Sequence, residues 1–300
     1  MDSSFTGRPS RVHDVVALAA GVLARVLRPV GGVLATVRLR IPFVTDGVPR
    51  AVFTRGVSVT RTDFHGMPVL TLVPPEPSGR IVVAVHGGAY VGRATFFHWW
   101  TYAGIARETG ATVHIPDYTL APIGTALTEV PRMADFIARV VSEDGAVGVL
   151  GDSAGGGLAL LAVQELVRRG GPTPNRLVLL APWLDVSMGD PRSAAVDDPL
   201  LDVDTMIEDG RLWAGDLDPR NPLASPLFGP LHGLPPTAVY CSSRDRLSID
   251  VLRLRDRVTA EDVPDVTFRL RAGLLHDYVM YAPLPDAKAE RVTVYADLGC

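Results

Sequence analysis

The sequence has 300 residues but only two cysteines and one lysine. Cys241 and Cys300 are too few for a disulfide framework, so we expect a reducing compartment and a cytoplasmic location. Because Lys288 is the only lysine, nearly all positive charge is arginine, which suggests an arginine-biased genome rather than a function. The net charge of −4 provides no basic surface, so we expect no nucleic-acid partner.

Motifs that hold metals or cofactors are also missing. The sequence contains no HExxH, no CxxC and no GxGxxG after an expected strand, so we expect neither a metal ion nor a cofactor. Its apolar run at residues 15–24 is interrupted by Arg25, Arg28 and Pro29 well before a membrane-spanning length. We expect an amphipathic helix there that packs on its own domain. Membrane contact by this segment is the less favoured alternative, and the oligomeric state stays open.

What is present is a hydrophobic content of 47% and, from residue 57, a regular alternation of strand and helix patterns. Such alternation predicts a mostly parallel α/β sheet flanked by helices. The expected strands are 57–60 and 69–73 as an antiparallel pair, then 81–85, 112–115, 147–150, 177–180, 237–241 and 266–270. The expected helices are 96–109, 130–141, 158–169 and 249–260.

Two regions interrupt this alternation. Residues 1–50 are helical and apolar in pattern, with no strand, and residues 186–225 are rich in Asp, Pro, Met and Trp. Long insertions between a strand and a helix often cover an active site. We therefore predict an N-terminal cap segment at 1–50 and a catalytic domain at 51–300, with a cap insertion at about 186–225.

The most informative stretch is Gly-Asp-Ser-Ala-Gly at 151–155, between the strand at 147–150 and the following helix. This G-x-S-x-G spacing is typical of a nucleophile elbow, in which a serine sits on a sharp strand-to-helix turn. We expect the flanking glycines to remove collisions with the strained Ser153 backbone. The N-terminus of the helix then favours negative charge that develops near the serine.

A serine nucleophile needs a base, an acid that orients the base, and donors for an oxyanion. Consecutive glycines at 86–90, His-Gly-Gly-Ala-Tyr, allow backbone N–H groups to approach a ligand oxygen. The chain order Ser…Asp…His favours His276 as base and Asp245, directly after the strand at 237–241, as acid. Asp250 is the rival acid, but it falls inside the next helix. We interpret Asp152 as structural.

The remaining histidines receive no catalytic role. We expect His86 to brace the glycine loop. The others are interpreted as structural or surface residues: His13, His65, His98, His114 and His232.

Taken together, these motifs resemble the hormone-sensitive-lipase-like esterases of the α/β-hydrolase fold, also called bacterial family IV. The resemblance covers residues 80–281 in order and spacing. The segments that carry it are His-Gly-Gly-Ala-Tyr at 86–90, Asp-Tyr-Thr-Leu-Ala-Pro at 117–122, Gly-Asp-Ser-Ala-Gly-Gly at 151–156, Pro-Trp-Leu-Asp at 182–185 and Ala-Ser-Pro-Leu at 224–227.

The resemblance implies a serine carboxylesterase of the α/β-hydrolase fold that acts on small acyl esters with short chains and needs no cofactor. It implies Ser153 as nucleophile, Asp245 as orienting acid and His276 as general base. It also implies a helical cap made of the N-terminal segment and the insertion. The oxyanion hole that it implies consists of backbone N–H groups of Gly88, Ala89 and Ala154, with Gly87 in the same turn.

The chain departs from the family pattern at several positions, which puts substrate choice in doubt rather than activity. Ala89 replaces the third glycine of the loop, Thr119 an arginine and Arg246 a proline. Ile123 stands where an acidic residue is usual, and residues 124–129 lack the usual Phe-Pro pattern.

Two functional alternatives and one structural alternative stay open. The same catalytic residues cleave amides or thioesters, and some members of this superfamily are non-catalytic binding proteins, although no triad residue is missing here. The aromatic residues near the glycine loop are either part of a narrow acyl pocket or helix core: Tyr90, Phe96, Phe97, Trp99 and Trp100.

Overall fold

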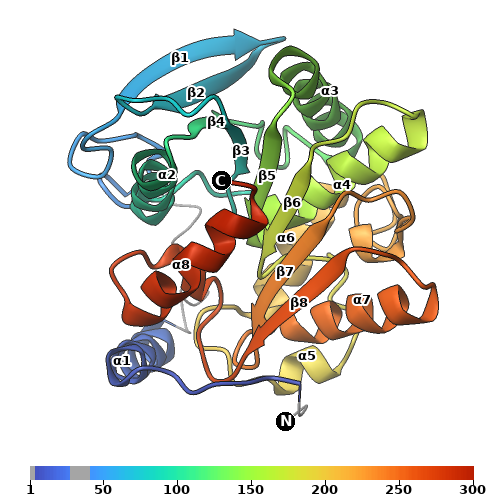
Figure 1. Ribbon diagram of the computed structural model, residues 1–300. Helices are drawn as coiled ribbons and strands as arrows, with labels where there is room; N and C mark the ends of the chain where they lie inside the picture. The colour runs from blue at the N-terminus through green and yellow to red at the C-terminus, as the bar shows by residue number, and fades with distance from the viewer. Residues whose placement is uncertain (1–3, 28–40) are drawn as a thin grey trace.

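The computed structural model describes residues 4–27 and 41–300, and its centre is an eight-stranded sheet (Figure 1). The order across the sheet is β1-β2-β4-β3-β5-β6-β7-β8; β1, β2 and β4 pair antiparallel and all other neighbours pair parallel. The expected mostly parallel α/β sheet is thus confirmed. The strands are β1 (Ser58–Phe64), β2 (Met67–Val73), β3 (Ile81–Val85), β4 (Thr112–Pro116), β5 (Val147–Asp152), β6 (Arg176–Leu180), β7 (Thr237–Ser242) and β8 (Val266–Arg271).

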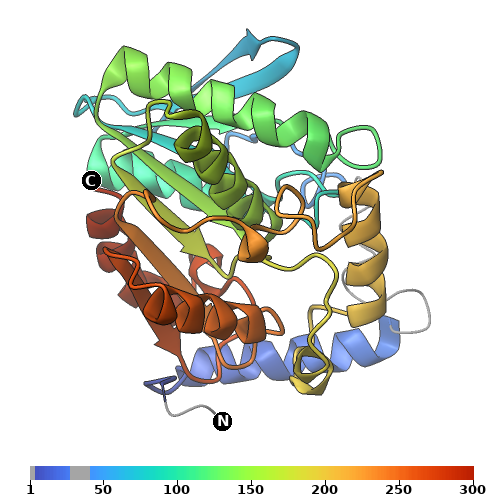
Figure 2. The same ribbon diagram turned by 90° about the vertical axis from the view of Figure 1, so that its right-hand side faces the viewer.

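Helices cover both faces of this sheet. α3, α4 and α7 pack on one face, and α2 and α8 pack on the other (Figures 1 and 2). The helices are α1 (Arg11–Leu27), α2 (Phe96–Thr109), α3 (Ala126–Asp144), α4 (Ser153–Arg169), α5 (Arg192–Ala195), α6 (Val203–Ala214), α7 (Ser248–Ala260) and α8 (Pro285–Asp297). Short 3₁₀ turns occupy Pro226–Phe228 and Tyr278–Met280.

Strand β3 shows why a continuous apolar run marks the centre of such a sheet. Alternate side chains of a strand point to opposite faces. Ile81, Val83 and Val85 accordingly join the core under α3 and α4, whereas Val82 and Ala84 join the core under α2. Because both faces are covered, every residue of the strand is buried, as its sequence predicted.

The helix boundaries agree with the sequence at some places and not at others. α2 spans the predicted residues 96–109. α3 begins at Ala126, earlier than the predicted residue 130, because Thr125 and Thr128 form a capping box ahead of the apolar pattern. α8 was not predicted. It starts with Pro285 in its first turn and buries Ala287 and Val294, too few apolar residues for a visible periodicity.

The expected N-terminal helix is present, but it contacts the domain with little of its apolar surface. α1 buries His13 and Ala17, while much of its apolar side is exposed. Polar contacts hold this orientation: the backbone N–H and hydroxyl of Ser10 donate to Asp286, and His13 Nε2 accepts the N–H of Leu275. The apolar residues of the helix that are exposed by half or more include Val15, Leu18, Val22 and Val26.

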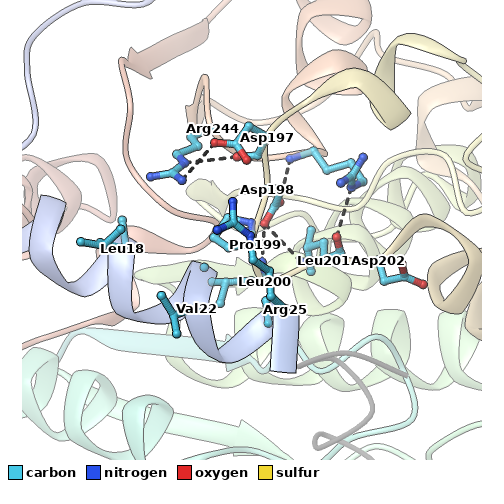
Figure 3. A pocket seen from close by; sticks show the side chains of 14 residues that line it. Leu18, Val22, Arg25, Asp197, Asp198, Pro199, Leu200, Leu201, Asp202 and Arg244 are labelled. Carbon is cyan, nitrogen blue, oxygen red and sulfur yellow. Dashed lines mark hydrogen bonds and ion pairs between the residues drawn. The ribbon is translucent and has the colours of Figure 1, made fainter. Parts of the chain in front are cut away.

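The second irregular region contains α5 and α6 and lies beside α1 (Figure 2). Residues 197–202 face α1 across a cavity of about 310 Å³ (Figure 3). The division into cap and catalytic domain stays a prediction, and residues 28–40 of the predicted N-terminal cap lie outside the described residues. In the ranges 4–27 and 41–300, every helix is too short or too polar to span a bilayer.

Candidate active site

Ser153 occupies a strained turn between β5 and α4. Its φ is 51°, in the left-handed region that a residue with a side chain rarely adopts. The surrounding glycines are required by close backbone approach. A Cβ on Gly151 would lie 2.4 Å from the carbonyl oxygen of Gly155, and one on Gly155 would lie 2.1 Å from that of Val85. The nearest obstacles are therefore backbone atoms, rather than the serine as the sequence suggested.

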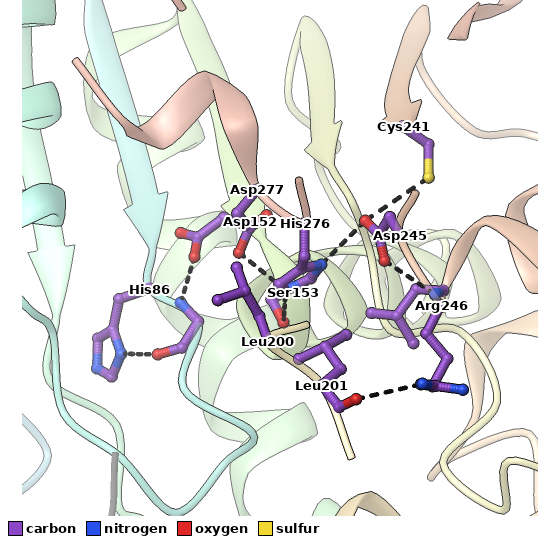
Figure 4. A network of polar contacts seen from close by, with 12 residues as sticks. His86, Asp152, Ser153, Leu200, Leu201, Cys241, Asp245, Arg246, His276 and Asp277 are labelled. Atoms are coloured by element: carbon purple, nitrogen blue, oxygen red, sulfur yellow. Dashed lines mark hydrogen bonds and ion pairs between the residues drawn. The ribbon is translucent and has the colours of Figure 1, made fainter. Parts of the chain in front are cut away.

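The structure brings Ser153, His276 and Asp245 together from three separate loops at the ends of strands (Figure 4). Ser153 Oγ lies 3.0 Å from His276 Nε2, and His276 Nδ1 lies 2.9 Å from Asp245 Oδ2. Since a carboxylate only accepts, the Nδ1 proton is donated to Asp245 and Nε2 is left for the serine hydroxyl. The other Asp245 oxygen accepts the N–H of Leu247 at 2.9 Å.

The charge on His276 is strongly favoured by its neighbours. Burial by itself lowers the pKa of His276, but the carboxylates of Asp245 and Asp277 outweigh it and hold that pKa well above the usual value. Asp245 is fully buried, whereas the rival Asp250 is bound to Arg253 in α7 and has no recorded contact with His276. This geometry agrees with the sequence interpretation that Asp245, rather than Asp250, orients the base.

The glycine loop after β3 lies beside the serine, but its N–H groups are not equivalent. The N–H of Gly87 donates to Asp152 Oδ2 at 3.0 Å, so it is occupied. For the N–H groups of Gly88 and Ala89, the described residues record no protein acceptor. Ala154 lies in the first turn of α4, where backbone N–H groups have no partner within the helix. The unoccupied donors therefore come from Gly88, Ala89 and Ala154.

Asp152 ties the glycine loop to α2. Besides the N–H of Gly87, its carboxylate accepts from His98 Nε2 at 3.0 Å and from the Tyr102 hydroxyl at 3.2 Å. Burial would raise the pKa of Asp152, but these partners, His98 first, lower it below the usual range. The structural interpretation of Asp152 agrees with this network. His98 and Tyr102 were not identified from sequence, because no local pattern indicates a partner about 50 residues away.

His86 braces the same loop from the other side, as predicted. Its Nδ1 contacts the carbonyl oxygen of Gly87 at 2.8 Å, and its ring stacks on Tyr118 with centroids 4.6 Å apart. The Tyr118 hydroxyl donates to the carbonyl oxygen of His86 at 2.9 Å. Burial lowers the pKa of His86, which favours a neutral ring with a structural function.

The segment at 197–202 is joined to the loop that carries Asp245. Figure 4 draws its Leu200 and Leu201 together with Ser153, whose own exposure is 8%. The Asp198 carboxylate accepts the backbone N–H groups of Leu200, Leu201 and Arg246. The Arg246 guanidinium in turn donates to the carbonyl oxygens of Leu201, at 3.2 Å, and Ser193. Arg246, where the family usually has proline, therefore fastens this segment to the loop that carries Asp245.

An aromatic stack joins the glycine loop to α6. Tyr90 lies parallel to Trp213 with centroids 3.9 Å apart and also stacks on Trp183 at 5.6 Å. All three rings are buried. Of the other aromatic residues considered from sequence, Trp99 is core and Trp100 is partly exposed. Trp213 was missed because it is distant from the glycine loop in sequence.

The described part of the chain holds no cluster of three or more His, Cys, Asp or Glu side chains arranged to bind a metal ion.

Comparisons with known proteins agree with this geometry. A family model described as alpha/beta hydrolase fold matches residues 82–280. A triacylglycerol lipase of Mycobacterium tuberculosis is 40% identical over 231 residues, which are 76% of this chain and 48% of that protein. The chain thus spans about half the length of that relative. LipR of the same organism, named as a candidate acetyl-hydrolase, is 31% identical over 253 residues, 82% of this chain and 80% of that protein.

A solved structure is also similar. An esterase from the bacterial hormone-sensitive lipase family superposes with a TM-score of 0.76 and 27% identity, over 89% of this chain and 95% of that one.

Proposed function

The chain belongs to the alpha/beta hydrolase fold family, and on that premise we propose that it is a serine carboxylesterase for short-chain acyl esters. The observation that carries this proposal is the hydrogen-bonded series from Ser153 Oγ through His276 to Asp245, with distances of 3.0 and 2.9 Å. The similar proteins are named lipase, acetyl-hydrolase and esterase, which supports ester hydrolysis as the reaction class.

In the first half of the reaction, Ser153 Oγ attacks the ester carbonyl carbon while His276 Nε2 takes the hydroxyl proton. Asp245 keeps the imidazole in the correct tautomer and stabilises its charged form. The carbonyl oxygen becomes an oxyanion, for which the N–H groups of Gly88, Ala89 and Ala154 are the unoccupied donors. His276 then gives the proton to the leaving alcohol oxygen, and the acyl-enzyme remains.

In the second half, water replaces the alcohol. His276 takes a proton from water as the water oxygen attacks the acyl carbon, and the same donors hold the second oxyanion. Returning the proton to Ser153 Oγ releases the carboxylic acid and restores the enzyme. Every proton that leaves a nucleophile in this scheme passes through His276 Nε2.

The surroundings of the serine support a short acyl chain. The rings of Tyr90 and Trp213 are stacked and buried directly after the glycine loop. Ala89 adds a methyl group where the family has glycine. A small-molecule acyl ester is therefore the proposed substrate. We also propose a cytoplasmic location, because two cysteines are too few for a disulfide framework.

The test is hydrolysis of p-nitrophenyl acetate, butyrate, octanoate and laurate by wild type and Ser153→Ala. We expect turnover to be highest with acetate or butyrate and to vanish in Ser153→Ala. Ser142→Ala, which changes an exposed serine of α3, is the matched control and should match wild type. Full activity in Ser153→Ala would overturn the serine mechanism, and a maximum at laurate would overturn the short-chain preference. If folded wild type cleaves none of these esters, the esterase proposal fails and amides and thioesters become the substrates to try.

A further inference from the structure

A second carboxylate touches His276 at the nitrogen that carries the serine proton. Asp277 Oδ2 lies 3.2 Å from His276 Nε2, and Ser153 Oγ lies 3.0 Å from the same atom (Figure 4). A φ of 55° at Asp277 puts this residue in the left-handed region. Asp245 occupies the opposite nitrogen, so the imidazole has a carboxylate at each end.

The contact with His276 is the one polar contact recorded for the Asp277 side chain within the described residues. Its other oxygen, Oδ1, is buried and has no hydrogen-bond partner among those residues. Asp245 differs in this respect, because both of its oxygens have donors, at Leu247 N–H and His276 Nδ1. A buried carboxylate that lacks other donors interacts all the more strongly with the charge that it does meet.

Other charged groups also face this centre. Burial raises the pKa of Asp277 to about 7, and the neighbouring His276 pulls it back only in part. On His276 the charges of Asp245 and Asp277 outweigh burial. Titratable groups that face the pair from other elements include Asp152 with its partners His98 and Tyr102, Asp198, Cys241, and Tyr281, whose hydroxyl donates to the His276 carbonyl oxygen.

We propose that Asp277 is a second catalytic carboxylate, which stabilises protonated His276 at Nε2 and thereby moves the rise of activity with pH to a higher pH. The inference rests on the proposed function. When Ser153 Oγ bonds to the acyl carbon, its proton moves to Nε2 and the imidazolium meets a negative charge at both ends. Where Asp277 is ionised, the same charge favours the protonated form of His276 in the free enzyme. Only the neutral imidazole accepts the serine proton. Activity therefore rises with pH as His276 loses its Nε2 proton.

The test is the pH profile of kcat/KM for wild type and Asp277→Asn. Asparagine has nearly the same shape and tolerates a positive φ, so the variant should fold. Removing the negative charge lowers the pKa of His276, and we expect the midpoint of the acid limb to move about 1 pH unit lower. Asp216→Asn removes the same charge at an exposed position and should leave the midpoint unchanged.

A purely structural role for Asp277 would lower the plateau of the profile without moving its midpoint, and that result would overturn the inference. A second readout does not depend on turnover. In histidine-labelled protein, the ring signal that disappears in His276→Gln should titrate at lower pH in Asp277→Asn than in wild type. If wild type cleaves no ester, the proposed function fails, but this NMR titration still decides whether Asp277 stabilises the charged imidazole. An unchanged titration would refute it.

Discussion

Two buried imidazole–carboxylate pairs flank Ser153, one on each side, and they are built from the same two residue types. In the first, His276 Nδ1 faces Asp245 at 2.9 Å; in the second, His98 Nε2 faces Asp152 at 3.0 Å. Both pairs are buried. Distance and burial alone therefore do not separate a catalytic pair from a structural one.

The difference lies in the second nitrogen of each ring. His276 Nε2 points at the serine hydroxyl, whereas His98 Nδ1 accepts the backbone N–H of Thr95 at 2.8 Å and caps the start of α2. A ring nitrogen that accepts a backbone N–H has no lone pair left to take a proton from a nucleophile. The same pair of side chains thus becomes a proton carrier or a brace according to whether the fold occupies that lone pair.

Breaking the first pair should have the largest effect. In Asp245→Asn the amide no longer holds the Nδ1 proton as a carboxylate does, so the imidazole loses the tautomer that accepts from Ser153. We expect kcat on p-nitrophenyl butyrate to fall about 10⁴-fold, as in serine hydrolases in general. The rival Asp250→Asn is the control and should retain kcat within a few-fold. A loss below about tenfold in Asp245→Asn, or an equal loss in both variants, would mean that Asp245 is not the orienting acid.

Breaking the second pair should lower kcat less than breaking the first, and it should act through the glycine loop rather than through the base. Asp152→Asn removes a charge that accepts from Gly87, His98 and Tyr102, so the loop that carries the proposed oxyanion donors loses its anchor. We expect a decrease in kcat of about 10²-fold, comparable to loss of one oxyanion donor, with KM nearly unchanged. The measurement is steady-state kinetics on p-nitrophenyl butyrate, together with thermal unfolding.

Tyr102→Phe is the graded control for this variant, because it removes one of the three donors and keeps the carboxylate. Its loss of kcat should be the smaller of the two. If Asp152→Asn lowers the melting temperature but leaves kcat intact, Asp152 stabilises the fold without positioning the loop.

The sequence predicted the first pair better than the second for a physical reason. Ser153, Asp245 and His276 each follow a strand of a parallel sheet, and the carboxyl ends of such strands meet at one edge, so their meeting could be predicted from strand patterns. His98 meets Asp152 across the packing of α2 on the sheet, which no local pattern encodes. The contact of Asp277 depends on a single left-handed backbone angle that the sequence does not reveal.

The cap region also contains contacts that sequence patterns do not predict. The apolar pattern of residues 15–26 predicted the helix α1, but polar anchors decide which side of it faces the domain. Likewise, Arg246 was identified as a departure from the family pattern, yet its contact with Leu201 depends on how a long insertion folds back. Periodicity fixes where an element lies in the chain, and specific polar contacts decide how it is turned.

A third buried imidazole, that of His13, extends the comparison. Of the changes predicted here, its replacement should have the smallest effect. His13 Nε2 accepts the N–H of Leu275, next to the proposed base, so this ring must be neutral at Nε2. Burial lowers the pKa of His13 below the usual value of about 6.5, and the charge of Asp286 offsets this only in part. The unfolded chain therefore binds a proton more readily, and the stability that His13 contributes above about pH 6.5 is lost as pH falls, by at most about 1.4 kcal/mol per pH unit.

Glutamine at position 13 keeps an acceptor but does not titrate. The free energy of unfolding of His13→Gln should therefore match that of wild type at pH 8 and decrease less than that of wild type between pH 8 and pH 5. Urea unfolding at both pH values measures the difference directly. His276 has the opposite sign: its pKa is raised on folding, so the stability from its charge is present below its unfolded pKa and lost as pH rises. A variant whose stability follows that of wild type at every pH would mean that burial of His13 has no energetic consequence.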